Sequence, residues 1–145
     1  MSEFKRVTPD FSVAAQLEPG DIARAATEGY RMIVINRPDG EDPGQPPTTE
    51  MKAQAEAAGL EFRTLAFTGL PPAPAIVAET AAMLDEANGP VLAYCRTGKR
   101  SITAWAMAQA LVGNRRPDEI IALAEKAGYD LRGARGALET LAPKA

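Results

Sequence analysis

A helix, a glycine and a strand follow one another three times in this chain, and this order constrains the fold more than any other feature. The glycines are Gly29, Gly59 and Gly89, and the helices before them are predicted at about residues 19–28, 47–58 and 73–88. After the first glycine comes Met32-Ile33-Val34-Ile35, an uninterrupted apolar run typical of a strand buried on both faces. Such units build a parallel sheet covered by helices. The sequence therefore predicts an α/β fold.

The rest of the chain fits one domain over residues 1–145. Strands are predicted at about residues 4–7, 11–14, 30–36, 60–67 and 91–94, and closing helices at 101–112, 117–127 and 133–141. With 145 residues, of which 46% are hydrophobic, the chain is large enough to bury a full core. We expect a single domain with a mostly parallel central sheet flanked by helices.

The only cysteine lies between the predicted strand at 91–94 and the predicted helix from Ser101. Its loop reads Cys95-Arg96-Thr97-Gly98-Lys99-Arg100. The first N–H groups of a helix lack partners and the helix dipole is positive there, so this loop predicts a cradle for an anion. The dipole and three nearby cations favour thiolate over thiol, which predicts that Cys95 is a nucleophile. An inert buried cysteine would gain nothing from those cations.

Composition excludes several other chemistries. The chain has no histidine, so it cannot hold a Cys-His dyad, a serine triad that uses histidine or a His-ligated metal, and one cysteine excludes a thiolate zinc cluster. We therefore expect no metal and no cofactor. A net charge of −3 argues against nucleic acid as a partner. The charged N-terminus and the absence of a long apolar stretch predict no membrane partner and a cytoplasmic location.

Three loops are predicted to converge, because an open α/β sheet places its ligands at the carboxyl ends of its strands. They are residues 37–47, 68–74 and 95–100. The first offers one cation and three carboxylates, namely Arg37, Asp39, Glu41 and Asp42. Arg37, Asp39 and Glu41 are therefore candidate contributors to the site. The alternative is an ordinary charged surface loop.

Three segments together resemble a known family. The Cys-Arg-Thr-Gly-Lys-Arg-Ser loop, Asn36 to Glu41 and Phe11 to Gln16 look like the bacterial phosphatase-like domain named for beta-lactamase hydrolase-like proteins (DUF442), over about residues 3–112. The resemblance implies a dual-specificity-phosphatase-like fold, with a rhodanese-like fold as the alternative because rhodaneses carry similar loops. Its members are described as candidate phosphatases or as sulfurtransferases of sulfide metabolism. Some are fused to a persulfide dioxygenase, which makes that enzyme a candidate functional partner.

Two features favour sulfur transfer over phosphate hydrolysis. Tyrosine phosphatases place five residues between cysteine and arginine, whereas four lie between Cys95 and Arg100. Residues 68–74, where a related phosphatase carries its acidic proton donor, contain no carboxylate, so Asp39, Glu41 or Asp42 would have to substitute. Transfer of sulfane sulfur expels a good leaving group and needs no such acid.

We therefore interpret the chain as a sulfurtransferase that carries sulfur from thiosulfate or a persulfide, as a Cys95 persulfide, to a thiol or cyanide. Arg96 and Arg100 would bind the donor anion, and Gly98 would let the loop N–H groups point inward. The other substrate-binding candidates are Thr97, Lys99 and Ser101, the last of which is predicted to cap the helix rather than to bond Cys95.

Two alternatives remain. The first is a cysteine-dependent phosphatase that hydrolyses phosphate esters through a phosphocysteine, with Arg100 on the phosphoryl oxygens. The second is a persulfide or redox sensor without turnover, although the chain has no second cysteine to resolve an oxidised Cys95. In each case the expected partner is a small anion.

Overall fold

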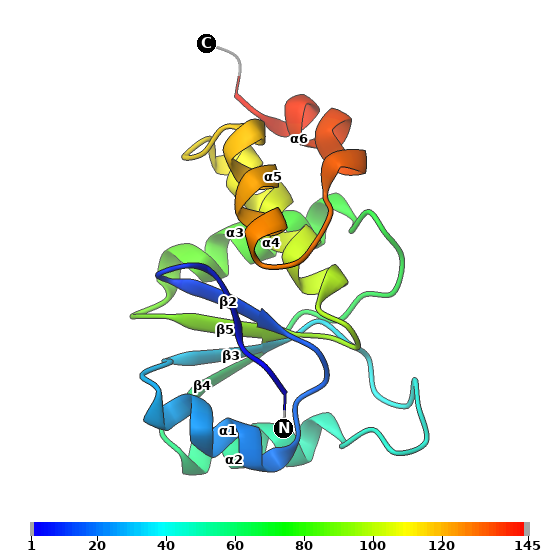
Figure 1. Cartoon of the computed structure of the whole chain (residues 1–145). Helices are drawn as coiled ribbons and strands as arrows, with labels where there is room; N and C mark the ends of the chain where they lie inside the picture. The colour runs from blue at the N-terminus through cyan, green and yellow to red at the C-terminus, as the bar shows by residue number, and fades with distance from the viewer. Residues whose placement is uncertain (1, 144–145) are drawn as a thin grey trace.

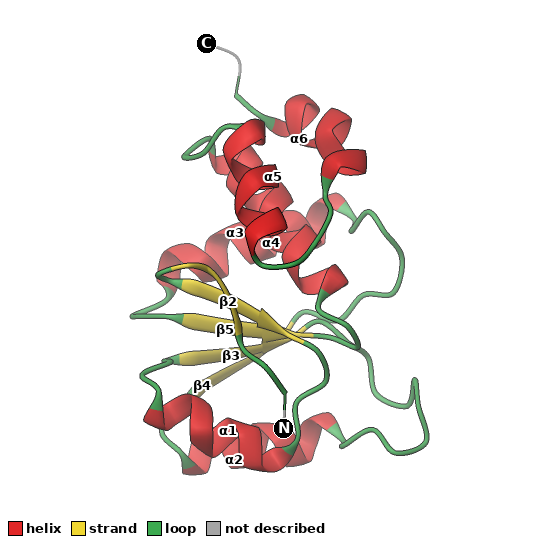
Figure 2. Ribbon diagram, in the orientation of Figure 1, coloured by secondary structure: helices red, strands yellow, loops and turns green. Residues whose placement is uncertain are grey.

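The computed structural model describes residues 2–143 and has three layers (Figures 1 and 2). One face of a central sheet carries two helices, and the other carries the remaining helices. The strands are β1 (Lys5–Thr8), β2 (Phe11–Ala14), β3 (Met32–Ile35), β4 (Glu61–Thr64) and β5 (Val91–Tyr94). The helices are α1 (Pro19–Thr27), α2 (Thr48–Ala57), α3 (Pro74–Glu86), α4 (Lys99–Val112), α5 (Pro117–Lys126), the 3₁₀ turn η1 (Arg132–Ala134) and α6 (Arg135–Leu141).

The sheet has five strands in the order β1-β2-β5-β3-β4. Only β1 runs antiparallel to its neighbour, so the predicted α/β class with a mostly parallel sheet is confirmed. β5 is the central strand, and its last residue, Tyr94, pairs with Ala14 of β2 and Ile35 of β3. The chain therefore leaves β5 at the middle of the carboxyl edge of the sheet, and Cys95 comes next.

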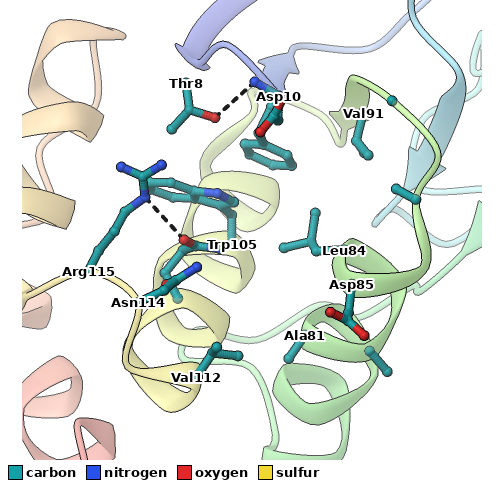
Figure 3. A pocket seen from close by; sticks show the side chains of 15 residues that line it. Thr8, Asp10, Ala81, Leu84, Asp85, Val91, Trp105, Val112, Asn114 and Arg115 are labelled. Carbon is teal, nitrogen blue, oxygen red and sulfur yellow. Dashed lines mark hydrogen bonds between the residues drawn. The ribbon is translucent and has the colours of Figure 1, made fainter.

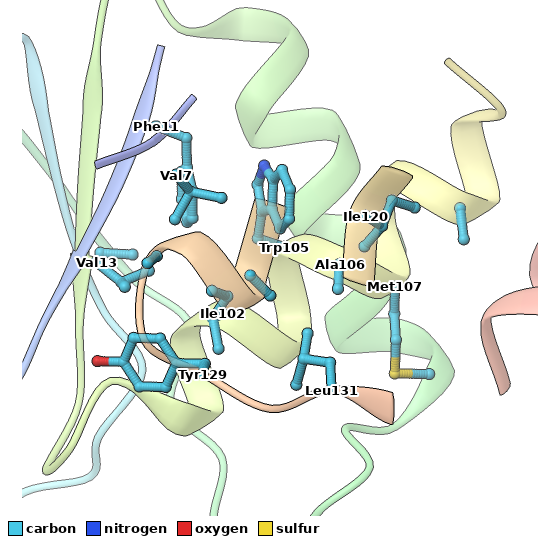
Figure 4. Packing of buried hydrophobic residues seen from close by; sticks show 14 of the residues in the cluster. Val7, Phe11, Val13, Ile102, Trp105, Ala106, Met107, Ile120, Tyr129 and Leu131 are labelled. Atoms are coloured by element: carbon cyan, nitrogen blue, oxygen red, sulfur yellow. The ribbon is translucent and has the colours of Figure 1, made fainter. Parts of the chain in front are cut away.

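Two apolar cores cover the faces of the sheet. On β5, Val91 and Ala93 face the core shared with α3 to α6, whereas Leu92 and Tyr94 face the core shared with α1 and α2. Figure 4 shows the first core, in which Trp105 of α4 stacks on Phe11 with ring centroids 5.5 Å apart. Burial on both faces explains why the inner strands are uninterrupted apolar runs.

Some predicted boundaries shift. β4 is shorter than the predicted 60–67, because it is an edge strand whose one neighbour, β3, ends at Ile35. α4 begins at Lys99 rather than Ser101, because the positive φ of Gly98 (+97°) turns the chain directly into the helix. The last helix begins at Arg135 instead of Gly133, because the preceding residues form η1.

Within residues 2–143, none of the helices has the length and apolar character that a bilayer crossing requires.

Candidate active site

The segment from the end of β5 to the first turn of α4 is hydrogen-bonded to residues just beyond β2, β3 and β4. Gln16, just beyond β2, donates its backbone N–H to the carbonyl of Arg96 at 3.3 Å, and Asn36, just beyond β3, donates to the carbonyl of Tyr94 at 2.9 Å. Arg100 donates to the carbonyl of Phe67, beyond β4, at 2.9 Å. The loops after β3 and β4 lie on the side of the sheet to which β5 points (Figure 1). The predicted convergence of loops at the carboxyl edge is therefore observed.

The Cys95 sulfur lies at the start of α4. It is 1% exposed and accepts the backbone N–H of Gly98 at 3.1 Å. Gly98 immediately precedes the helix, with φ of +97°, a conformation that residues with a Cβ rarely adopt. A Cβ atom at this position would lie 2.0 Å from the hydroxyl oxygen of Tyr129. Both the turn and the close approach of Tyr129 require glycine here.

Arg100, in the first turn of α4, turns its guanidinium back toward Cys95. Nη1 donates to the Phe67 carbonyl and, at 3.0 Å, to Glu41 Oε2, while Nη2 donates to Glu41 Oε1 at 2.8 Å. Glu41 is the main reason that the pKa of Arg100 is raised, and Cys95 acts in the same direction. Of the five N–H donors of arginine, these contacts use three and leave the Nε–H and one Nη2–H of Arg100.

Glu41 is held between two arginines. Arg37 is only 2% exposed and donates from Nε to Glu41 Oε1 at 2.7 Å, from Nη1 to Gln16 Oε1 at 2.8 Å and from Nη2 to Asp42 Oδ2 at 2.5 Å. The hydrogen bond from Arg100 and then that from Arg37 lower the pKa of Glu41 to about 2. Arg37 therefore holds Glu41, which in turn orients Arg100. The alternative of an ordinary surface loop does not describe these two side chains.

The other two carboxylates of the same loop have different partners. Asp39 is exposed and accepts the backbone N–H and the hydroxyl of Thr48 at 2.8 and 2.6 Å, at the start of α2. These bonds lower the pKa of Asp39. Asp42 accepts Arg37 and lies 3.4 Å from Nε of Arg96, whose side chain is 66% exposed. Asp39 therefore stabilises the start of α2, and Arg96 turns toward Asp42.

The remaining candidates of the cysteine loop have structural partners. The Thr97 carbonyl accepts the Tyr129 hydroxyl at 2.8 Å, and Lys99 Nζ donates to the carbonyl of Asp130 at 2.7 Å. The prediction that Ser101 caps the helix is wrong, because α4 begins two residues earlier and Gly98 holds the cap position. The Ser101 hydroxyl is buried and lacks a hydrogen-bond partner among the described residues.

Three contributors to the site were not predicted from the sequence. Gln16 supports both Arg37 and the carbonyl of Arg96, and its place just after a predicted strand was a usable signal. The Phe67 carbonyl accepts a hydrogen bond from Arg100, but every residue type has a backbone carbonyl, so the sequence gives no signal for this contact. Tyr129 lies 32 residues from Thr97 in sequence, and no motif links the two.

A separate cavity of about 660 Å³ lies at the opposite edge of the sheet (Figure 3). It opens beside Phe11 and Val91, the first residues of β2 and β5, and is also lined by Trp105 and Arg115. The cysteine follows the last residue of β5, so this cavity does not belong to the candidate active site. Among residues 2–143, no three Cys, Asp or Glu side chains gather where they could hold a metal ion.

Comparison with known proteins identifies the family. A family model described as "Beta-lactamase hydrolase-like protein, phosphatase-like domain" matches residues 3–112. The chain belongs to this family. A beta-lactamase hydrolase-like protein of Agrobacterium fabrum is 32% identical over 134 residues, which make up 92% of this chain and 31% of that protein. The chain thus spans less than a third of the length of this relative, and the resemblance noted in the sequence is confirmed.

Solved structures support a cysteine-phosphatase fold. A candidate phosphatase from Neisseria meningitidis is 31% identical, with a TM-score of 0.83 over 95% of this chain and 97% of that one. Tk-PTP in its active form is 16% identical, with a TM-score of 0.74 over 95% of both chains, and supports the fold alone. The α/β fold is therefore of the cysteine-phosphatase type, and the phosphatase-like family indicates an enzyme.

Proposed function

We propose that this protein is a cysteine-dependent phosphatase that hydrolyses small phosphate esters through a phosphocysteine. The proposal rests on one observation. The Cys95 sulfur, the Gly98 N–H and the Arg100 guanidinium lie together at the N-terminus of α4. This arrangement places a nucleophile and anion-binding donors around one point, where a phosphoryl group requires them.

Each group has a defined role in the proposed reaction. The Cys95 thiolate attacks phosphorus, and the bond from phosphorus to the leaving oxygen breaks with its electron pair on that oxygen. The helix N-terminus and Arg100 bind the equatorial phosphoryl oxygens, on which much of the charge resides. Water then attacks phosphorus, the S–P bond breaks, and inorganic phosphate leaves while the thiolate is restored.

The prediction of sulfur transfer is not supported. Four residues between Cys95 and Arg100 were expected to leave too small a cradle for phosphate, yet Arg100 lies close enough to Cys95 for the cysteine to raise the pKa of Arg100. The family match and the Neisseria structure support the phosphatase alternative and give no support to thiosulfate or a persulfide as substrate. A persulfide dioxygenase partner and the sensor without turnover stay predictions.

The test is phosphate release from nitrophenyl phosphate, with Cys95→Ser as the control. We expect steady turnover by the wild type, none by the variant, and a phosphocysteine adduct by intact mass spectrometry after rapid acid quench. A parallel sample receives thiosulfate or glutathione persulfide. A sulfur adduct on Cys95 that cyanide discharges, together with no phosphate release, would return sulfur transfer to first place.

A further inference from the structure

Breaking a phosphate ester leaves negative charge on the departing oxygen. An alkoxide is a poor leaving group, so phosphatases that act on alkyl esters protonate it, and such proton transfer is typically worth about 10² to 10⁴ in rate. A phosphoanhydride, an acyl phosphate or an electron-poor aryl phosphate releases a weakly basic anion that needs no proton. Whether the site holds a proton donor therefore determines which class of phosphate compound it can cleave.

Each carboxylate of the loop after β3 is engaged as a hydrogen-bond acceptor or an ion-pair partner. Glu41 accepts three hydrogen bonds from Arg37 and Arg100. Asp39 accepts two from Thr48, and Asp42 pairs with Arg37 and Arg96. A proton on Glu41 would displace one of these donors, because both of its oxygens accept. Asp39 accepts through Oδ1, and Asp42 meets both arginines through Oδ2. These contacts tie all three carboxylates to donors of the protein.

The loop after β4 and residues 95–100 contain no carboxylate. The loop after β4, which passes Arg100 at the Phe67 carbonyl, continues as Thr68-Gly69-Leu70-Pro71-Pro72-Ala73-Pro74. Its side chains are apolar except for one alcohol. Arg96 and Arg100 do not deprotonate in proteins, and Lys99 Nζ is directed to the Asp130 carbonyl.

Building on the proposed phosphatase activity, we propose that its substrates carry a weakly basic leaving group, as in phosphoanhydrides, acyl phosphates and electron-poor aryl phosphates. This inference rests on Glu41, Asp39 and Asp42, whose carboxylates accept from Arg37, Thr48 and Arg37, respectively. In the first step the Cys95 sulfur bonds to phosphorus, and the leaving group departs with the electron pair and takes its proton, if any, from solvent. The second step is hydrolysis of the S–P bond.

The experiment measures kcat/KM for dinitrophenyl, nitrophenyl and phenyl phosphate, because kcat/KM reports the steps through cleavage of the P–O bond. We expect kcat/KM to fall by about 10²-fold or more across the series, since nothing compensates the rising basicity of the leaving oxygen. Acetyl phosphate should be hydrolysed and glycerol phosphate should not. A flat series, or turnover of glycerol phosphate at a rate similar to dinitrophenyl phosphate, would overturn the inference and leave the phosphatase proposal intact.

A second variant checks for a hidden acid. Asp39→Asn removes the titratable proton but keeps an oxygen that can accept from Thr48, so the fold should be unaffected. We expect the same dependence on the leaving group as in the wild type. A selective loss with phenyl phosphate would identify Asp39 as the acid and overturn the inference. No hydrolysis of any aryl phosphate would instead refute the phosphatase proposal itself.

Discussion

Glu41 joins the two buried or half-buried arginines of the site into one unit. Its carboxylate accepts two hydrogen bonds from Arg100, whose guanidinium interacts with Cys95. We expect Glu41→Gln to lower kcat/KM about tenfold or more, because an amide loses the charge that orients the guanidinium. The control is Glu56→Gln on the exposed side of α2. An unchanged kcat/KM in Glu41→Gln would show that Arg100 does not depend on this contact.

The same carboxylate predicts how stability depends on pH. The pKa of Glu41 falls from an ordinary value of 4.5 to about 2, so its contribution to folding is fully present above pH 4.5 and is lost as pH falls toward 2. The difference in unfolding free energy between wild type and Glu41→Gln should therefore be constant above pH 4.5 and shrink below it. Denaturant titrations at several pH values measure this, and a difference that shrinks only above pH 5 would contradict the assigned ion pair.

Tyr94 is the residue before the cysteine, and its hydroxyl is buried without a hydrogen-bond partner among the described residues. Burial raises its pKa. We expect Tyr94→Phe to increase the free energy of unfolding by about 1 kcal/mol, because an unsatisfied polar group leaves the core. Tyr30→Phe is the matched control, since the Tyr30 hydroxyl donates to Ser12 Oγ at 2.7 Å and its loss should destabilise the protein. Equal effects of the two variants on stability would contradict this account.

At the scale of elements, the junction between β5 and α4 depends on one glycine. Gly98→Ala should destabilise the protein and abolish most activity, because its Cβ would collide with Tyr129 as well as force an unfavourable φ. Gly128 has the same φ of +97° and open space around it, so Gly128→Ala isolates the backbone cost of about 1–2 kcal/mol. Thermal unfolding and phosphatase assays of both variants separate the two effects. Equal losses of stability and activity in the two variants would mean that Tyr129 moves aside from the new Cβ atom at no cost.

The elements themselves were largely predictable from sequence. Two apolar runs, at residues 32–35 and 91–94, identified inner strands, because burial on both faces of a sheet limits which residues a strand can carry. The cysteine that follows the second run indicated the place of the site. The direction of Arg37 was not predictable, since loop sequence does not determine which carboxylate a long side chain reaches. The start of α4 was misplaced because Gly98 was interpreted only as a source of inward N–H groups and not as the helix cap.

Across the whole molecule, the chain after α4 returns to support the cysteine loop. Tyr129 donates to the Thr97 carbonyl, its ring lies under Lys5 Nζ, and the neighbouring Asp130 carbonyl accepts Lys99. We expect Tyr129→Phe to lower kcat/KM several-fold while changing the free energy of unfolding by only about 1 kcal/mol, the cost of one hydrogen bond. Loss of stability with an unchanged kcat/KM would assign Tyr129 a purely structural role.

Tyr129 and Asp130 lie beyond residue 112, where the family match ends. Two homologues can therefore carry an identical cysteine loop and still differ in reactivity, because substitutions in the C-terminal helices alter what holds that loop in place. Substitutions of this kind leave the cysteine motif unchanged, so the motif alone does not determine how firmly its loop is held.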